Sequence, residues 1–192
     1  MTFESIRQAI LDDPANSAHR ANGYLPVYAA GPRARIAVIG QAPGRKAQES
    51  GIAWNDASGN TLFDWLGVSA EQFRDPDEFA LIPMDFYYPG KGNSGDLPPR
   101  KEFAPQWHPQ LLAVMPDIRL TILIGGYAQA FYLHGRLERN LTETVHAFRN
   151  YLPTIIPLVH PSPLNFRWQA RNPWFVSELL PELRERVAEA LA

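Results

Sequence analysis

Short apolar runs closed by glycine or polar residues recur along the chain and alternate with stretches of helical periodicity. The first run, residues 35–40 (R-I-A-V-I-G), is typical of a strand that is buried on both faces of a parallel sheet. Because helical patterns separate the runs, their order predicts an α/β fold, a three-layer α/β/α domain around a central four-stranded, mainly parallel sheet. The predicted strands are residues 35–40, 79–84, 120–125 and 154–159.

Helical spacing of apolar side chains predicts the elements that cover this sheet. At one end of the chain, Phe3, Ile6 and Ile10 recur every three or four residues. At the other end, Asn172 and Pro173 are typical of a helix start, with asparagine as the cap and proline in the first turn. The predicted helices are residues 3–12, 61–66, 103–115, 127–133, 141–151 and 174–191.

Composition narrows the classes of protein. A chain of 192 residues with 45% hydrophobic content can bury one sizeable core, so we expect a single domain over residues 1–192. The absence of cysteine excludes disulfides, thiolate metal sites and iron–sulfur clusters. No apolar run approaches the roughly 18 residues of a membrane helix, and the charged N-terminal stretch does not resemble a signal peptide. We therefore expect a cytoplasmic monomer with no membrane segment.

Three polar loops rich in glycine and proline follow predicted strands, at residues 41–60, 85–100 and 160–172. In an open parallel sheet, ligands bind beyond the carboxyl ends of the strands. We therefore expect these loops to form one site. The net charge of −2 supplies no general attraction for nucleic acid, so binding to DNA would need local cations. The candidates for such a basic rim are Arg45, Lys46, Arg100, Lys101, Arg167 and Arg171.

The first loop begins with G-Q-A-P-G at residues 40–44, which lacks the spacing of a phosphate-binding loop and of a dinucleotide fingerprint. It continues with G-I-A-W-N-D-A-S-G at residues 51–59, where Trp54 and Asp56 place an indole and a carboxylate close together. A tryptophan in such a position serves either as part of the core or as a surface on which a flat base stacks. The residues alone leave both readings of Trp54 open.

The third loop begins with H-P-S-P-L-N at residues 160–165. One interpretation is a capped turn with a hydrogen-bonded histidine. The other is a stiff loop in which His160 polarises a ligand and Leu164 separates stacked groups, while Arg167 and Trp168 contact phosphates and bases. The remaining histidines lack paired metal-ligand spacing, so no metal site is expected, and no G-x-S-x-G motif of an acyl hydrolase is present.

Together, the G-Q-A-P-G and G-I-A-W-N-D segments and the H-P-S-P-L-N segment resemble the two signature motifs of the uracil-DNA glycosylase superfamily. Residues 88–93 and 102–107 also resemble the thermostable, iron–sulfur branch, and the resemblance runs from about residue 35 to residue 175. It implies an enzyme of base-excision repair that binds DNA containing a damaged base, flips that base out and hydrolyses its N-glycosidic bond. No metal or other cofactor is implied.

The resemblance also assigns roles to single residues. Trp54 matches the aromatic that stacks on the flipped base, His160 the family histidine, and Leu164 the intercalating leucine. The family's acid matches poorly, because Gln41 stands where the iron–sulfur branch has glutamate and Ala42 where the best-known branch has aspartate. The expected catalytic residues are His160, Asp56 and Gln41; the expected base-binding residues are Trp54, Ala42 and Asp85; and the expected DNA-binding residues are Gly44, Ser162, Leu164, Asn165 and Arg167.

Two departures from the family bear on chemistry and specificity. Phe103 occupies the position of a cluster cysteine, so no iron–sulfur cluster is expected. The asparagine by which the family recognises uracil is replaced in the 83–86 region, which leaves three alternatives open. The first is excision of uracil. The second is excision of another deaminated base such as hypoxanthine, with Asp85 accepting its hydrogen bonds, and the third is a catalytically silent DNA-binding protein.

Overall fold

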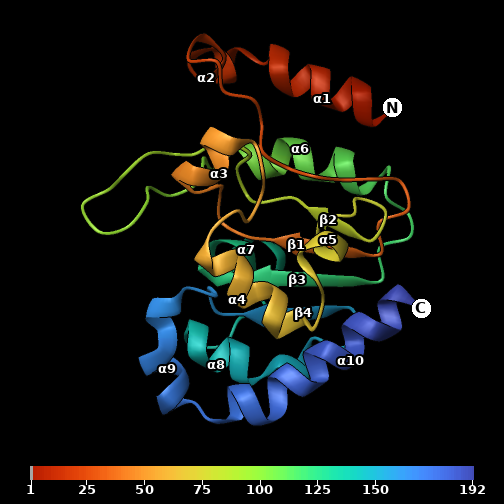
Figure 1. The fold of residues 1–192 in the computed structure, drawn as a ribbon, viewed down its shortest axis with the longest axis vertical. Coiled ribbons are helices and arrows are strands. Elements are labelled where there is room, and N and C mark those ends of the chain that lie inside the picture. Colours follow the sequence, from red (N-terminus) through yellow and green to blue (C-terminus); the bar gives the residue numbers. More distant parts are fainter. Residues whose placement is uncertain (1) are drawn as a thin grey trace.

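The computed structural model describes residues 2–192 and contains a four-stranded sheet at its centre (Figure 1). The strands are β1 (Ile36–Ile39), β2 (Phe79–Leu81), β3 (Leu120–Ile124) and β4 (Ile155–Leu158). All neighbours pair in parallel in the order β2-β1-β3-β4. The four predicted strands and their parallel arrangement are confirmed, and the carboxyl ends of the strands lie at one edge of the sheet.

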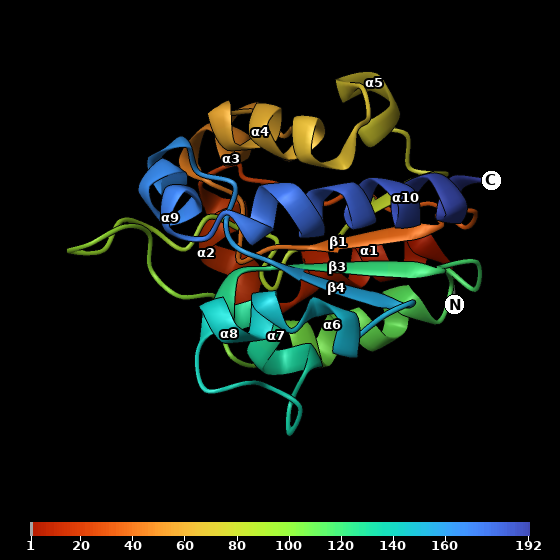
Figure 2. The ribbon, with the colours of Figure 1, turned by 90° about the horizontal axis from the view of Figure 1, so that it is seen from below.

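Helices cover both faces of the sheet, as seen from below in Figure 2. Successive strand side chains point to opposite faces, so Val38 and Ile122 join one buried cluster while Ile39 and Leu123 join the other. The first cluster includes side chains of α4 (Ala57–Leu66), α5 (Ala70–Phe73), α8 (Leu141–His146) and α10 (Leu180–Leu191). The second includes side chains of α1 (Phe3–Asp12), α6 (Phe103–Leu112) and α7 (Gly125–Tyr132). This is the predicted three-layer α/β/α arrangement.

Several short helices lie where the sequence pattern predicted only loops. They are α2 (Ser17–Ala21), α3 (Arg45–Ser50), α5 and α9 (Phe166–Arg171), together with 3₁₀ turns at Pro14–Asn16 and Pro163–Asn165. Each is too short for an amphipathic repeat to appear in the sequence. The helices α3 and α9 and the 3₁₀ turn at Pro163–Asn165 lie within the loops that were expected to form the site. Within the predicted helix 141–151, α8 ends at His146 and Phe148–Asn150 form a separate 3₁₀ turn.

The C-terminal helix covers the predicted residues 174–191 but opens with a different kind of turn. Residues Phe175–Leu179 form a π-helical turn that leads into α10. Asn172 does not cap this segment, because its side-chain amide donates a hydrogen bond to the Trp168 carbonyl oxygen at 2.8 Å. The predicted cap at Asn172 is therefore wrong. Among residues 2–192, no helix combines the length and apolar character needed to cross a membrane.

His108 is a fully buried histidine that supports the end of β2. Its Nε2 lies 2.9 Å from the Pro83 carbonyl oxygen and its Nδ1 lies 2.7 Å from the Tyr132 hydroxyl. The carbonyl can only accept, so Nε2 carries the proton and Nδ1 accepts from the tyrosine. Burial lowers the pKa of His108 to about 4, despite the opposing effect of the Pro83 carbonyl. The ring is therefore neutral in the folded protein at pH 7.

We predict that this histidine makes the protein sensitive to mild acid. Because its folded pKa lies below the unfolded value of 6.5, the unfolded chain binds more protons between the two values, and stability falls as the pH drops through that window. The expected loss from His108 is about 2 kcal/mol between pH 7.5 and pH 5. Urea unfolding at both pH values measures it. His108→Gln should lose this part of the pH dependence, while His134→Gln, at an exposed histidine, should keep it.

Candidate active site

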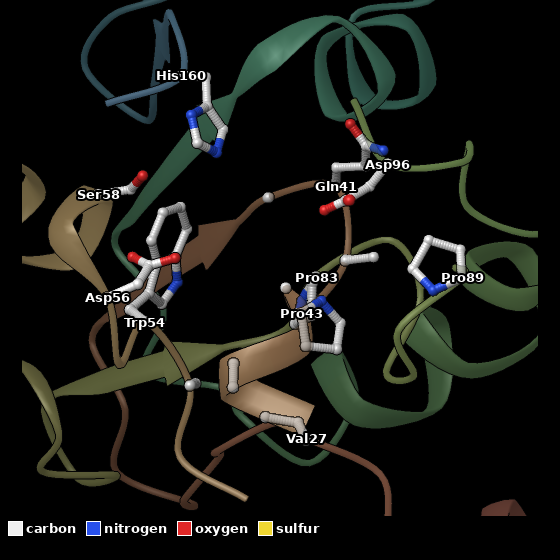
Figure 3. Close-up of a pocket in the computed structure, with 15 residues that line it drawn as sticks. Val27, Gln41, Pro43, Trp54, Asp56, Ser58, Pro83, Pro89, Asp96 and His160 are labelled. Atoms are coloured by element: carbon white, nitrogen blue, oxygen red, sulfur yellow. The ribbon is translucent and has the colours of Figure 1, made fainter. Parts of the chain in front are cut away.

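A pocket of about 350 Å³ opens at the carboxyl end of β1, where the three loops meet (Figure 3). Trp54 and Asp56 lie on one side of it, Gln41 and Asp96 lie on the other, and His160 stands above. Loops from three strands therefore converge as the parallel sheet predicts. The lining residues are Val27, Gly40, Gln41, Ala42, Pro43, Gly44, Ala47, Ala53, Trp54, Asp56, Ser58, Pro83, Pro89, Asp96 and His160.

The aromatic wall of the pocket is Trp54, which is held between two glycines. A Cβ on Gly40 would stand 3.1 Å from Cζ2 of the indole, and a Cβ on Gly59 would overlap the Trp54 carbonyl oxygen. Trp54 also has a φ of 56°, a left-handed conformation that is uncommon for a residue with a side chain. A backbone held in this region costs of order 1–3 kcal/mol and persists only where the surroundings enforce it. The indole packs partly on the core and partly lines the pocket, so core packing does not remove it from the site.

Asp56 lies beside the tryptophan at the N-terminus of α4. Its Oδ1 accepts a hydrogen bond from the backbone N–H of Gly59 at 2.9 Å and so caps the helix, which is why α4 begins earlier than predicted. Its Oδ2 lies 3.9 Å from the point where a Cβ on Gly44 would stand. Oδ1 of Asp56 therefore stabilises the start of α4, and Oδ2 faces the pocket.

His160 follows β4, and its ring centroid lies 6.1 Å from that of Trp54 at an interplanar angle of 31°. His160 is exposed at the mouth of the pocket, and the surrounding loops desolvate its ring in part. This desolvation lowers the pKa of His160, although the negative charges of Asp56 and Asp96 act to raise it. The imidazole is therefore neutral at pH 7 and has one N–H to donate.

Gln41 and its neighbours form the opposite wall. The Gln41 side-chain amide donates a hydrogen bond to the Leu97 carbonyl oxygen at 2.9 Å, which ties the β1 loop to the loop after β2. Ala42 and Gly44 also line the pocket, so the structure brings them together with Gln41, Trp54, Asp56 and His160. These residues were all expected in the site.

Asp96 lines the pocket but was not among the expected site residues. It lies in residues 89–97, a hairpin-like loop that extends away from the body of the molecule in Figures 1 and 2. The sequence offered two signals: the loop follows a strand, and Gly-Asn-Ser-Gly just before Asp96 is typical of a turn. The sequence does not show that Asp85 is buried and that Asp96 faces the pocket, because both aspartates lie in the same polar loop.

The segment 160–165, which we call the wedge loop, is stiff and carries an exposed leucine. Leu164 is 83% exposed, an unusual placement for a large apolar side chain that is not shielded by neighbours. The Ser162 hydroxyl accepts a hydrogen bond from the Leu164 N–H at 3.2 Å, and the Asn165 side-chain amide donates to the His160 carbonyl at 2.7 Å. The side chains of Ser162 and Asn165, which were expected to bind DNA, thus make hydrogen bonds that stabilise the conformation of the wedge loop.

A second, larger hollow of about 500 Å³ adjoins the first and shares Gln41 and His160 with it. Its walls come from the start of α7, the wedge loop and α9, and they are mostly apolar. The two hollows together make a continuous concave surface along the carboxyl edge of the sheet. The remaining lining residues are Ile124, Gly125, Gly126, Tyr127, Leu141, Val159, Asn165 and Trp168.

The base-binding position expected for Asp85 is corrected by the structure. The Asp85 side chain is 2% exposed and pairs with Arg100, whose Nε donates to Oδ2 at 2.7 Å and whose Nη2 donates to Oδ1 at 2.8 Å. The backbone N–H groups of Tyr87 and Arg100 also bond to this carboxylate. Asp85 is absent from the pocket lining because these donors hold it inside the protein.

The expected basic rim is only partly in place. Arg100 is committed to Asp85 and to Asn16, where its Nη1 bonds to Oδ1 at 2.7 Å. None of the six expected cations lines the pocket itself. Arg45 and Lys46 lie on the surface of α3, next to Gly44. The exposed side chains of Arg167 and Arg171 lie on α9, after the wedge loop, and Lys101 is also exposed.

The fold and the pocket define an α/β protein with a base-sized site at the carboxyl edge of its sheet. The model of the Uracil DNA glycosylase superfamily matches residues 27–184, which is most of the chain. The chain belongs to this superfamily, and its membership indicates a protein that acts on DNA. In the described part of the chain, no three His, Cys, Asp or Glu side chains gather in a group that fits a metal ion.

We predict that the buried ion pair is essential for stability. Arg100→Ala would leave the Asp85 carboxylate buried and short of partners, which typically costs about 3–5 kcal/mol. Chemical denaturation should show this loss, whereas Lys101→Ala, which removes an exposed neighbouring cation, should change the unfolding free energy by less than about 0.5 kcal/mol. Equal stability of the two variants would contradict this account of Asp85.

Proposed function

We propose that the protein is a DNA glycosylase that hydrolyses the N-glycosidic bond of a flipped-out deaminated base during base-excision repair. The observation that carries this proposal is the arrangement around one pocket of Trp54, neutral His160 and the Asp56 carboxylate, with exposed Leu164 on the same loop as the histidine. A flat aromatic surface, a hydrogen-bond donor and a negative charge are the groups that this reaction needs.

The bond breaks through a state with positive charge on the sugar and negative charge on the departing base. A base stacked on Trp54 lies close to His160, whose N–H donates to a base oxygen as the electron pair of the C1′–N bond moves onto the base. The Oδ2 atom of Asp56 stabilises the sugar cation. Water then adds to C1′, and the carboxylate accepts one of its protons. Gln41 supplies a second polar group beside that water.

Contacts of the wedge loop with DNA offset the free-energy cost of base extrusion. Flipping a nucleotide costs a few kcal/mol of stacking and pairing. Leu164 is 83% exposed, so it is available to fill the space in the duplex that the base leaves. The exposed side chains of Arg167 and Arg171 lie on the next helix and neutralise flanking phosphates.

Uracil is the first substrate to test, and hypoxanthine is the second. Purified protein is incubated with oligonucleotides that carry uracil, hypoxanthine, xanthine or a thymine mismatch, and abasic sites are then cleaved with alkali. Strand cleavage at one of these bases supports the proposal. No cleavage at any of them, from protein that binds the oligonucleotides, would refute it.

A catalytically silent DNA-binding protein is the second candidate. Gln41 in place of a carboxylate favours it, as does the use of one Asp56 oxygen as a helix cap. Both candidates require contacts with phosphates, so the affinity for DNA should fall steadily as the salt concentration rises. An affinity that does not depend on salt would exclude both.

We predict that His160→Ala lowers single-turnover cleavage by roughly a hundredfold or more, the usual effect of losing a preorganised oxyanion donor. DNA binding should persist, and His134→Ala should cut normally. Asp56→Asn retains a good helix cap and so isolates the role of the charge. It should also cut more slowly than the wild type. If Asp56→Asn cleaves at the wild-type rate while His160→Ala is inactive, the site works without this carboxylate.

A separate prediction concerns extrusion. Leu164→Ala should slow cleavage in duplex DNA, and its defect should shrink on single-stranded substrates, where little stacking must be broken. The measurement is the ratio of duplex to single-strand rates. Leu137→Ala, at another exposed leucine, is the control and should leave the ratio unchanged. A Leu164→Ala defect of equal size on both substrates would assign this leucine to the chemistry or the fold.

A further inference from the structure

We propose that Asp96 is the residue that recognises the base, by accepting a hydrogen bond from the ring N–H that deamination creates. This inference rests on the proposed function and names its substrate class: deaminated pyrimidines and purines as a group. It assigns the recognition of the base to the loop after β2, at a residue separate from the buried Asp85.

The position of Asp96 suits this role because the base of its loop is tied to the pocket wall, while the tip of the loop extends into solvent. The hairpin-like loop 89–97 is closed by hydrogen bonds between Gly92 and Gly95 and between Leu97 and Gly90, each at 2.9 Å. The Gln41 amide bonds to the Leu97 carbonyl at 2.9 Å, directly beside Asp96. Figure 3 shows Asp96 and Gln41 across the pocket from Trp54, so they face the edge of a ring that stacks on the indole.

The two oxygens of Asp96 are not equivalent. Oδ1 accepts a hydrogen bond from the Tyr88 hydroxyl at 3.3 Å and lies 3.9 Å from Nζ of Lys91. Within the described residues, Oδ2 accepts no hydrogen bond from the protein. The side chain is 40% exposed and lines the pocket. One oxygen is therefore oriented by neighbours, and the other is open to a single donor in the pocket.

A single carboxylate oxygen distinguishes a deaminated base from its parent. Cytosine has a lone pair at N3 and adenine has one at N1, and an acceptor facing a lone pair is repelled. Deamination turns cytosine into uracil, with N3–H, and adenine into hypoxanthine, with N1–H. An ionised carboxylate only accepts, so it bonds to both products and rejects both parents.

The same chemistry sets the breadth of recognition. Thymine and guanine also carry a ring N–H, so the proposal concerns only the two pairs that deamination relates. An asparagine side chain offers an N–H₂ group as well as an oxygen and can also recognise a base carbonyl. A carboxylate lacks that donor and recognises only the feature that uracil and hypoxanthine share. The geometry therefore points to one site for both products.

The test measures binding without cleavage. Single-stranded oligonucleotides carry one 2′-fluoroarabino nucleotide, which resists hydrolysis, with uracil, cytosine, hypoxanthine or adenine as its base. Fluorescence anisotropy gives the Kd of each for the wild type, Asp96→Ala, Asp96→Asn and Asp117→Asn. The last variant removes an equal charge from the loop before β3, at the opposite edge of the sheet. Single strands remove differences in base pairing from the comparison.

We expect the wild type and Asp117→Asn to prefer uracil over cytosine and hypoxanthine over adenine by roughly tenfold to a hundredfold, the usual effect of one hydrogen bond to a charged group. Asp96→Ala should lose both preferences through weaker binding of the deaminated bases. Asp96→Asn should lose them through tighter binding of cytosine and adenine, because its amide can donate to their lone pairs. A purely structural role for Asp96 would not produce these opposite changes.

Two outcomes would overturn the proposal: a wild type that binds each pair of bases equally, or preferences that survive in Asp96→Ala. Cleavage of natural oligonucleotides, measured in parallel, keeps the two proposals distinct. If the wild type binds the deaminated bases more tightly than their parents but cleaves none of them, the glycosylase activity is refuted and the role of Asp96 in recognition is supported. If Asp96→Ala still cleaves uracil and hypoxanthine at unchanged relative rates and leaves the parent bases intact, the glycosylase activity is supported and the role of Asp96 in recognition is refuted.

Discussion

The architecture of the pocket depends on a steric constraint at Trp54. A Cβ on Gly59 would overlap the Trp54 carbonyl oxygen, a Cβ on Gly40 would crowd the indole, and the Trp54 backbone is left-handed. This geometry places the ring opposite His160 and sets Asp56 at the start of α4. The position of this one aromatic side chain therefore shapes the pocket, because His160 and Asp56 are placed around it.

Charge is divided between the pocket and its surroundings in a way that suits the proposed reaction. The charged groups that line the pocket are the carboxylates of Asp56 and Asp96, and desolvation keeps the histidine between them neutral. Exposed cations lie outside, on α3 and α9. Phosphates therefore find positive charge at the surface, while a sugar that becomes cationic finds negative charge within. A chain with a net charge of −2 can accommodate DNA by this separation.

The strands and the location of the site could be predicted from the sequence because buried parallel strands have a distinct apolar pattern and ligands gather at their carboxyl ends. The π-helical turn of the C-terminal helix, its lack of a cap at Asn172 and the short helices α3 and α9 could not be predicted, because they depend on local hydrogen bonds or contain too few residues for a repeat. Asp85 was expected in the pocket and Asp96 was not. The two aspartates lie in the same loop, and only the tertiary partner Arg100 reveals which one is buried.

The hydrogen bond from Asn165 to the His160 carbonyl has a consequence for how the wedge loop moves. Two of the residues between His160 and Leu164 are prolines, whose φ angles are fixed, and the asparagine closes the segment into a ring. Histidine and leucine therefore belong to one rigid body. Under the proposed function, a movement that seats the leucine in a duplex also moves the imidazole, so extrusion of the base and placement of the histidine are mechanically coupled.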